Sequence, residues 1–423
     1  MPNYLDLFAG AGGLSEGFIR AGYEPVAHVE MDAAACYSLK TRAAYHWLKQ
    51  QNKISIYDQY LRQEISRDEF YQHIPQHILD SVLNYEISED SLQNIFSDID
   101  KFLSGKKLDL IVGGPPCQAY SIAGRSRSAN HMVGDKRNYL YKLYAEFLKK
   151  YNPKYFVFEN VVGLKSARDE DKTLHLENMQ MLFKQCGYST DWRVLNAVDY
   201  GVLQNRKRII LIGKRGEYKD FYPDIPVIKN NYRVYELFCD LPFIKAGGGE
   251  ITPVKTLPYS GKYLYEAGIK EYDQEPVTYH QARPNTPQDL EIYRIVVDTW
   301  NKKKMRVAYT DLPERLRTHN NTKSFLDRFK VVAGNLSCTQ TVVAHICRDG
   351  HYYIHPDIAQ NRSLTPREAA RIQTFPDNYY FESVTGKPSR TLAYKQIGNA
   401  VPVRLAYNVA MALLKYFKED SSI

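Results

Sequence analysis

Short apolar runs alternate with amphipathic segments over the first part of the chain. Two of these runs cover residues 4–8 and 26–30, separated by a glycine-rich turn and a helix-like segment that begins near Ser15. Apolar runs of this length are typical of buried strands. Strand, helix and strand within about 30 residues predicts an α/β protein with a doubly wound sheet. The alternation resumes later and predicts a helix at 139–150 and strands at 108–112, 155–158, 193–197 and 208–212.

Two segments interrupt the alternation. Residues 37–95 are polar and carry the capping-box spacing Ser66-x-x-Glu69, so we predict a helical insertion. A surface decoration is the simpler interpretation, and an arm that contacts DNA or a partner is the alternative. Residues 215–365 contain three consecutive glycines at 247–249, many prolines and little helical periodicity. They predict a second, smaller domain of irregular and β structure.

Helical periodicity returns at 366–373 and at 403–417, where the apolar stripe is explained by core packing. We therefore expect a larger domain built from residues 1–214 and 366–423, interrupted by the smaller domain at 215–365.

The amino-acid composition is that of an ordinary globular protein and excludes few classes of protein. Apolar residues make up 44% and charged residues 25% of the 423 residues, which is ordinary for a globular protein. The net charge of +8 is a mild basic excess that suits a nucleic-acid partner without requiring one. We find no run of about 18 apolar residues and no leader, so we expect no membrane span or signal peptide. The six cysteines form no C-x-x-C pair, which favours free thiols in a reducing cytoplasm.

A histidine and cysteine cluster near residue 350 suggests a metal site at first sight. The spacing of His345, Cys347, His351 and His355 matches no zinc template. Alternation of Val343, His345 and Cys347 indicates one face of a strand, so we expect no metal.

The first candidate site is the turn Asp6–Gly13, which leaves a strand and enters a helix. Small glycine turns let a ligand approach the N–H groups of a helix start. Its spacing departs from the dinucleotide fingerprint, because position 15 is serine. Glu30, 20 residues past Gly10, is an acid placed to bind a ribose diol. A tight turn with a surface acid is the alternative.

The second candidate is Gly113–Gln118, which contains Cys117 and follows the apolar strand 110–112. Two prolines stiffen this turn, and α/β enzymes place their chemistry at the carboxyl ends of parallel strands. A lone cysteine is more often a small buried apolar residue. The rigid Gly/Pro frame favours a nucleophile here.

Two further motifs carry charged groups. Glu159 follows the apolar strand 155–158 and is a general acid or base candidate, or an ordinary acid at a strand end. Strand alternation would place Gln204, Arg206 and Arg208 on one face, where two guanidinium groups could hold a base edge or a phosphate. A solvated basic strand is the alternative.

Together these motifs resemble the cytosine-5 DNA methyltransferase family. D-L-F-A-G-A-G-G, G-P-P-C-Q, F-E-N-V and Q-N-R-K-R occur in the family order, followed by L-T-P-R-E-A-A-R-I-Q and Q-I-G-N-A-V-P. The resemblance covers residues 3–35, 94–214 and 362–415, whereas 37–95 and 215–361 are where members vary. It implies a Rossmann-like methyltransferase domain that uses S-adenosylmethionine, and a separate target-recognition domain.

The resemblance also implies a role for each matching residue. Cys117 matches the nucleophile, Glu159 and Arg208 the groups that hold the flipped cytosine, and Arg206 and Asn399 supporting residues. The residues matching the methyl-donor site are Phe8, Gly10 and Gly13 in the turn, Glu30 at the ribose, Met31 at the adenine, Asp98 and Ile99 at the adenine edge, and Pro116, Leu140 and Val401 along the pocket wall. Met31 stands where the family often has an aromatic residue, and Asn138 where it often has glycine.

The mechanism implied is addition of the Cys117 thiolate to carbon 6 of a flipped cytosine, followed by methyl transfer to carbon 5. Arg125, Arg127, Lys136 and Arg137 would close over phosphates. By resemblance we expect double-stranded DNA as substrate, a monomer in the bacterial cytoplasm, and a functional partnership with a restriction endonuclease without a stable complex. An RNA cytosine methyltransferase and an inactive DNA-binding relative are the rival hypotheses.

Overall fold

A seven-stranded sheet forms the centre of the computed structural model, which describes residues 1–116, 139–169 and 171–419. The strand order is β3-β2-β1-β4-β5-β7-β6, and every neighbouring pair is parallel except those made by β7, which is antiparallel to β5 and β6. The predicted doubly wound α/β fold is confirmed. The strands are β1 Asn3–Leu7, β2 Glu24–Glu30, β3 Val82–Asn84, β4 Leu110–Gly113, β5 Tyr155–Val161, β6 Tyr188–Asn196 and β7 Lys207–Arg215.

The register of the sheet brings four strand ends to one edge. Leu7 of β1 pairs with Val29 of β2 and with Gly113 of β4, and Gly113 pairs with Phe158 of β5. The residues that follow these four therefore emerge side by side. The strand order also reverses between β1 and β4, and ligands of open α/β sheets bind at such a switch point.

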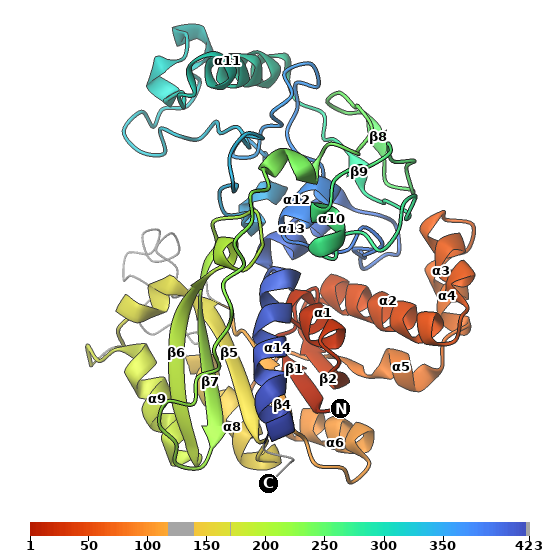
Figure 1. Cartoon of the computed structure of the whole chain (residues 1–423), viewed down its shortest axis with the longest axis vertical. Helices are drawn as coiled ribbons and strands as arrows, with labels where there is room; N and C mark the ends of the chain where they lie inside the picture. Colours follow the sequence, from red (N-terminus) through yellow and green to blue (C-terminus); the bar gives the residue numbers. More distant parts are fainter. Residues whose placement is uncertain (117–138, 170, 420–423) are drawn as a thin grey trace.

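Helices cover both faces of the sheet (Figure 1). One face packs against α1 (Gly13–Arg20) and α14 (Val403–Glu419), and the other against α6 (Leu92–Leu103), α8 (Leu140–Tyr151) and α9 (His175–Gln185). The helices α1 and α14 touch closely, because a Cβ added to Gly17 would lie 2.5 Å from Cβ of Ala406. Segments almost 400 residues apart thus share one layer.

The segment predicted as a helical insertion contains more than helices. The capping box at Ser66 and Glu69 is present at the start of α4, but β3 also lies within 37–95, and the first helix begins earlier, at residue 33. This three-residue edge strand is too short to produce a readable pattern. The helices here are α2 (Ala33–Gln50), α3 (Ile54–Leu61), α4 (Arg67–Gln72) and α5 (Gln76–Asp80).

Residues 215–365 lie above the carboxyl edge of the sheet in Figure 1 and have little regular structure. They contain the two-residue strands β8 (Gly249–Glu250) and β9 (His280–Gln281), and the short helix α10 (Tyr263–Glu266). The helix α11 (Pro287–Lys303) was not predicted from the sequence, although it begins with a capping box between Thr286 and Asp289. The 3₁₀ turns that lie wholly within the described residues are η2 Val162–Ser166, η3 Ala197–Asp199, η4 Val234–Leu237, η5 Tyr309–Asp311, η6 Glu314–Leu316 and η7 Ala344–Cys347.

The chain returns to the sheet through α12 (Pro366–Ile372), α13 (Arg390–Asn399) and α14. By length and composition alone, the stretch Arg390–Glu419 could cross a membrane, which the sequence analysis did not anticipate. Of its most apolar window, 61% is buried inside the protein. The stretch is interrupted after Asn399 and its second half packs on α1, so it serves as core structure in this fold.

Candidate active site

The turn after β1 has the backbone conformation of a ligand-binding loop. Phe8, Gly10 and Gly12 all have positive φ, at 57°, 55° and 74°. The N–H of Gly10 donates to Oε2 of Glu30 at 2.8 Å, and the N–H of Asp32 donates to the other oxygen at 2.7 Å. The carboxylate of Glu30 is thereby fixed beside the turn, as predicted from its position at the end of β2.

Asp6 lies beneath this turn and was not singled out from the sequence. Its side chain is 1% exposed, and neither carboxylate oxygen has a hydrogen-bond partner among the residues that the structure describes. Burial, and secondarily the charge of Glu30, raise the pKa of Asp6 well above its usual range. Buried polar groups are nearly always paired, so an orphaned carboxylate beside a glycine turn fits a ligand that brings a donor or a positive charge.

The other wall of the turn comes from the far end of the chain. A Cβ added to Gly13 would lie 2.4 Å from the carbonyl oxygen of Val401. Arg206 holds this segment: its guanidinium donates to the carbonyl oxygens of Ala400 at 2.9 Å and of Val342 at 2.5 Å, and it is 1% exposed. Arg206 is therefore a positioning residue in this structure.

A carboxylate and a guanidinium meet at the ends of β5 and β7. Nε of Arg208 lies 2.7 Å from Oε1 of Glu159, and both side chains are 12% exposed. Gly114, in the turn after β4, leaves no room for a side chain there, since a Cβ would lie 2.6 Å from Oε2 of Glu159. The amide of Asn160 anchors the same turn by donating to the carbonyl oxygen of Pro115 at 3.4 Å.

The structure thus brings Glu159 and Arg208 to the turn 113–116, which directly precedes the predicted nucleophile in the sequence. Cys117 itself lies outside the described residues, as do Arg125, Arg127, Lys136, Arg137 and Asn138. Pro116, the last residue described before the gap, and Leu140, the first residue of α8, flank it.

Asp98 and Ile99 are not brought to this edge. Both lie in the middle of α6, about 9 Å along the helix from its start. Ile99 is fully buried in the core, and the carboxylate of Asp98 accepts from Lys101 at 2.7 Å and from Tyr85 at 3.0 Å. The segment that does follow β3 at the level of Glu30 is 85–87, because Asn84, the last residue of β3, is the register partner of Glu30.

Two of the remaining candidates lie at the rim. Met31 follows Glu30 and is 57% exposed, and its carbonyl oxygen accepts from the Asn84 amide at 3.1 Å. Asn399 is exposed at the last position of α13.

Two expectations about strand alternation are wrong. Gln204, Arg206 and Arg208 do not share a strand face, because β7 begins only at Lys207 and Gln204 is fully buried against Gln373. Residues 343–347 are not a strand either, since η7 occupies 344–347. Within the described part of the chain, no group of three or more His, Cys, Asp or Glu side chains could hold a metal ion.

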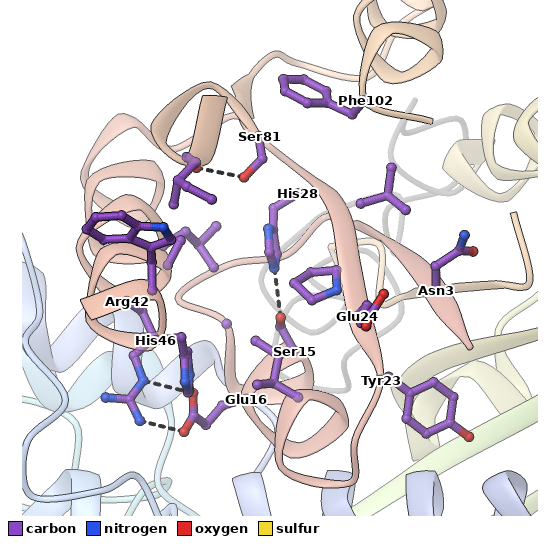
Figure 2. A pocket seen from close by; sticks show the side chains of 18 of the residues that line it. Asn3, Ser15, Glu16, Tyr23, Glu24, His28, Arg42, His46, Ser81 and Phe102 are labelled. Atoms are coloured by element: carbon purple, nitrogen blue, oxygen red, sulfur yellow. Dashed lines mark hydrogen bonds and ion pairs between the residues drawn. The ribbon is translucent and has the colours of Figure 1, made fainter. Parts of the chain in front are cut away.

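A separate cavity of about 560 Å³ lies between α1, β2 and α2. Figure 2 shows Ser15 hydrogen-bonded to His28 at 2.7 Å, and Arg42 paired with Glu16. Burial lowers the pKa of His28 to about 4, so the ring is neutral at pH 7. Gly12 of the turn after β1 lines this cavity, but Gly10 and Glu30 do not.

Comparison with known proteins identifies the family. The family model for C-5 cytosine-specific DNA methylases matches residues 3–70 and 83–415. The chain belongs to the C-5 cytosine-specific DNA methylase family. This enzyme therefore transfers a methyl group from S-adenosylmethionine to carbon 5 of cytosine in DNA.

Individual relatives agree with this family. The methylase is 39% identical to the type II methyltransferase M.Bpa9945I of Bacillus paralicheniformis, over 97% of this chain and 98% of that one. It is 29% identical to the type II methyltransferase M.DdeI of Desulfomicrobium norvegicum, over 100% and 90% of the two chains. Its fold is similar to the crystal structure of a prophage-encoded methyltransferase from E. coli, with a TM-score of 0.62 and 21% identity, covering 99% of this chain and all of the other.

The described residues fit the methyl donor of this family. S-adenosylmethionine carries an ammonium and a sulfonium, which suit the unpartnered carboxylate of Asp6, and a ribose diol, which suits Glu30. Gly10 has no heavy atom within 4 Å of the position of a Cβ, which leaves the backbone of the turn open to the donor there, whereas Gly13 is packed against Val401.

Proposed function

We propose that this methylase flips a cytosine out of a specific duplex site and methylates it through a covalent bond to Cys117. The observation that supports this most directly is the pair Glu159 and Arg208, held 2.7 Å apart beside Gly114. The turn 113–116 joins this pair to the predicted nucleophile, and a base must leave the helix stack to reach such a site.

Each group has a distinct task in this proposal. The thiolate of Cys117 adds to carbon 6, which breaks the aromaticity and makes carbon 5 nucleophilic. Glu159 protonates ring nitrogen 3 as negative charge develops on the ring, and Arg208 holds the carbonyl oxygen at carbon 2. S-adenosylmethionine supplies the methyl group. Loss of the carbon 5 proton to a base, departure of the thiolate and return of the nitrogen 3 proton to Glu159 restore the neutral aromatic base.

For the donor we propose the turn residues Phe8, Gly10 and Gly13, with Asp6 at the ammonium and Glu30 at the ribose. In this proposal Met31 lies at the adenine. The wall of the donor pocket is formed by Pro116, Leu140 and Val401, and Asn399 supports the pocket. For the adenine edge we replace Asp98 and Ile99 by Glu86 and Ile87, because only the latter follow β3 at the level of Glu30.

The wider context is also a proposal. We propose that residues 215–365 recognise the target sequence in the major groove, and that the enzyme acts as a monomer in the bacterial cytoplasm. Its relatives M.Bpa9945I and M.DdeI are type II methyltransferases. We infer that it protects DNA from a cognate restriction endonuclease without forming a stable complex with it.

A mechanism-based trap tests the proposal. A duplex with 5-fluorocytosine at the target should become covalently attached to a peptide containing Cys117, only when S-adenosylmethionine is present, because fluorine cannot leave as a cation. Cys117→Ser should bind the duplex but give no adduct, since affinity comes mostly from phosphate contacts. Turnover of the normal duplex without any adduct from the fluorinated one would refute the covalent step. An adduct with fluorinated RNA in preference to DNA would instead support an RNA methyltransferase.

A further inference from the structure

The part of the chain around α11 forms a lobe with its own hydrophobic core. We name residues 287–333 the α11 lobe. The core residues come almost entirely from this lobe, with Ile354 as the one fully buried addition. In Figure 1 the α11 lobe stands at the end of the molecule opposite both termini, beyond the carboxyl edge of the sheet. An independent core makes the lobe a rigid support for whatever its surface carries.

The α11 lobe is basic, with ten lysines and arginines against six aspartates and glutamates. Residues 301–330 contain nine lysines and arginines against three aspartates and glutamates, whereas the whole chain has a net charge of +8. Lys303, Arg317 and Lys323 are exposed, and the side chain of none of the three has a hydrogen bond or ion pair with any residue that the structure describes. Unpaired exposed cations gathered on one lobe are the electrostatic signature of a surface that binds phosphates.

An aromatic side chain projects from this basic lobe at a strained backbone position. Phe325 is 61% exposed and has a φ of 55°. Left-handed backbone is unfavourable for any residue with a Cβ, and an exposed phenyl ring contributes little to folding. Neither feature is explained by the stability of the lobe, and strained residues of this kind gather at functional sites.

The loop that presents Phe325 is fixed by hydrogen bonds. The side-chain oxygen of Asn321 accepts from the N–H groups of Lys323 at 3.1 Å and Ser324 at 3.0 Å. Arg328 donates to the carbonyl oxygens of Asn321 at 2.7 Å and Phe325 at 3.1 Å, and its guanidinium lies 3.9 Å from the ring centre of the buried Tyr309. The phenyl ring is thus held outward in advance of binding.

We propose that the α11 lobe, within the recognition segment 215–365, carries a wedge contact to the duplex, in which Phe325 inserts against a base step while Lys303, Arg317 and Lys323 contact neighbouring phosphates. Proteins that distort DNA use apolar side chains as wedges between base pairs, and aromatic stacking on bases tolerates any sequence. This inference rests on the proposed action on duplex DNA. It adds a contact outside the cytosine pocket that anchors the enzyme on the duplex.

Fluorescence of 2-aminopurine tests the insertion. The probe is placed at successive steps of a duplex that contains the target site, with S-adenosylhomocysteine present so that no turnover occurs. Wild-type protein should raise the fluorescence at one step besides the target cytosine, and Phe325→Ala should abolish that rise and weaken binding about tenfold. Phe243→Ala is the matched control, because Phe243 is 55% exposed in the same variable segment and has no positive φ.

Salt dependence tests the phosphate contacts. Lys303→Ala, Arg317→Ala and Lys323→Ala should each reduce the slope of log affinity against log salt by about 1. Lys415→Ala, on the exposed end of α14, should leave the slope unchanged. The inference is overturned if Phe325→Ala and Phe243→Ala both bind the duplex with affinities within twofold of wild type. It is also overturned if Phe325→Ala instead removes a concentration-dependent self-association of the protein. Methylation of the same duplex by the wild-type protein is measured in parallel. If the wild type methylates this duplex, the proposed function holds even when the inference about the α11 lobe fails.

Discussion

The carbonyl oxygen of Val401 lies where a side chain on Gly13 would have to be, 2.4 Å from the position of its Cβ. We expect Gly13→Ala to displace either the donor turn or the segment 399–402, and to weaken binding of S-adenosylmethionine at least tenfold by calorimetry. Gly10→Ala is the comparison. It has open space around the new Cβ but a φ of 55°, so it meets only the left-handed strain of about 1–2 kcal/mol and not a collision. Equal effects of the two substitutions would argue against the steric explanation.

Glu159→Gln should separate chemistry from binding. The substitution keeps the shape of the side chain but removes the acid, so single-turnover methylation should fall by about 10² to 10⁴. The affinity for the duplex should change little, because Glu159 contacts one base. The control is Glu177→Gln on the surface of α9. A rate within threefold of wild type would remove Glu159 from the reaction.

Arg206 should matter for stability and donor affinity more than for the rate of transfer. Arg206→Met leaves the carbonyl oxygens of Val342 and Ala400 without this donor, which costs about 3 kcal/mol. We expect a lower Tm and a raised KM for S-adenosylmethionine, with a smaller change in kcat. A variant with normal stability and a collapsed kcat would place Arg206 in contact with the reacting base instead.

Stability should depend on pH through Glu382. Burial raises the pKa of this carboxyl to about 7, although Thr41 and Tyr60 donate hydrogen bonds to it. The unfolded chain, with an ordinary pKa of about 4.3, loses its proton first as pH rises. The stability contributed by the proton of Glu382 is therefore present at low pH and is lost between about pH 4 and pH 7.

Urea unfolding at several pH values measures this contribution. Glu382→Gln should lose less stability than wild type as pH rises through that window, and the two curves should run parallel above it. Glu146→Gln, a surface residue paired with Lys149, should follow the wild type. Parallel curves for Glu382→Gln over the whole range would contradict the raised pKa.

Sequence specificity should be carried by residues 215–365. A chimera that takes this segment from a relative with another target should methylate the relative's site, as read by bisulfite sequencing. A folded, active chimera that keeps the original site would show that recognition lies elsewhere in the chain.

Strand prediction succeeded where strands are long and central. Runs such as 108–112 and 208–212 are apolar on both faces because helices cover both sides of the sheet. The edge strand β3 has three residues, which is too few for a pattern. The helix α11 was readable in principle, because Ile292, Val296 and Trp300 recur at helical spacing. The surrounding prolines and glycines concealed it.

The position of a candidate residue at the sheet edge could be predicted where the residue directly follows a strand, but not where the choice depended on a short match. Glu30 and Glu159 emerge at the predicted edge because the register of parallel strands fixes where strand ends meet. Asp98 and Ile99 were chosen on a two-residue match and lie within a helix instead. Arg206 was expected on a strand face, but the strand begins one residue later and its side chain turns inward. The orphaned carboxylate of Asp6 has no signature in the sequence, since only the fold shows that nothing pairs with it.

The packing of α1 on α14 has a consequence for synthesis on the ribosome. The donor turn is among the first segments translated, yet the carbonyl of Val401 that closes it emerges about 390 residues later. At about 5–20 residues per second, that interval is roughly 20 to 80 s. A nascent chain would therefore hold an incomplete donor site for almost its entire period of translation, and ribosomes that stall or terminate before α14 would release protein unable to methylate.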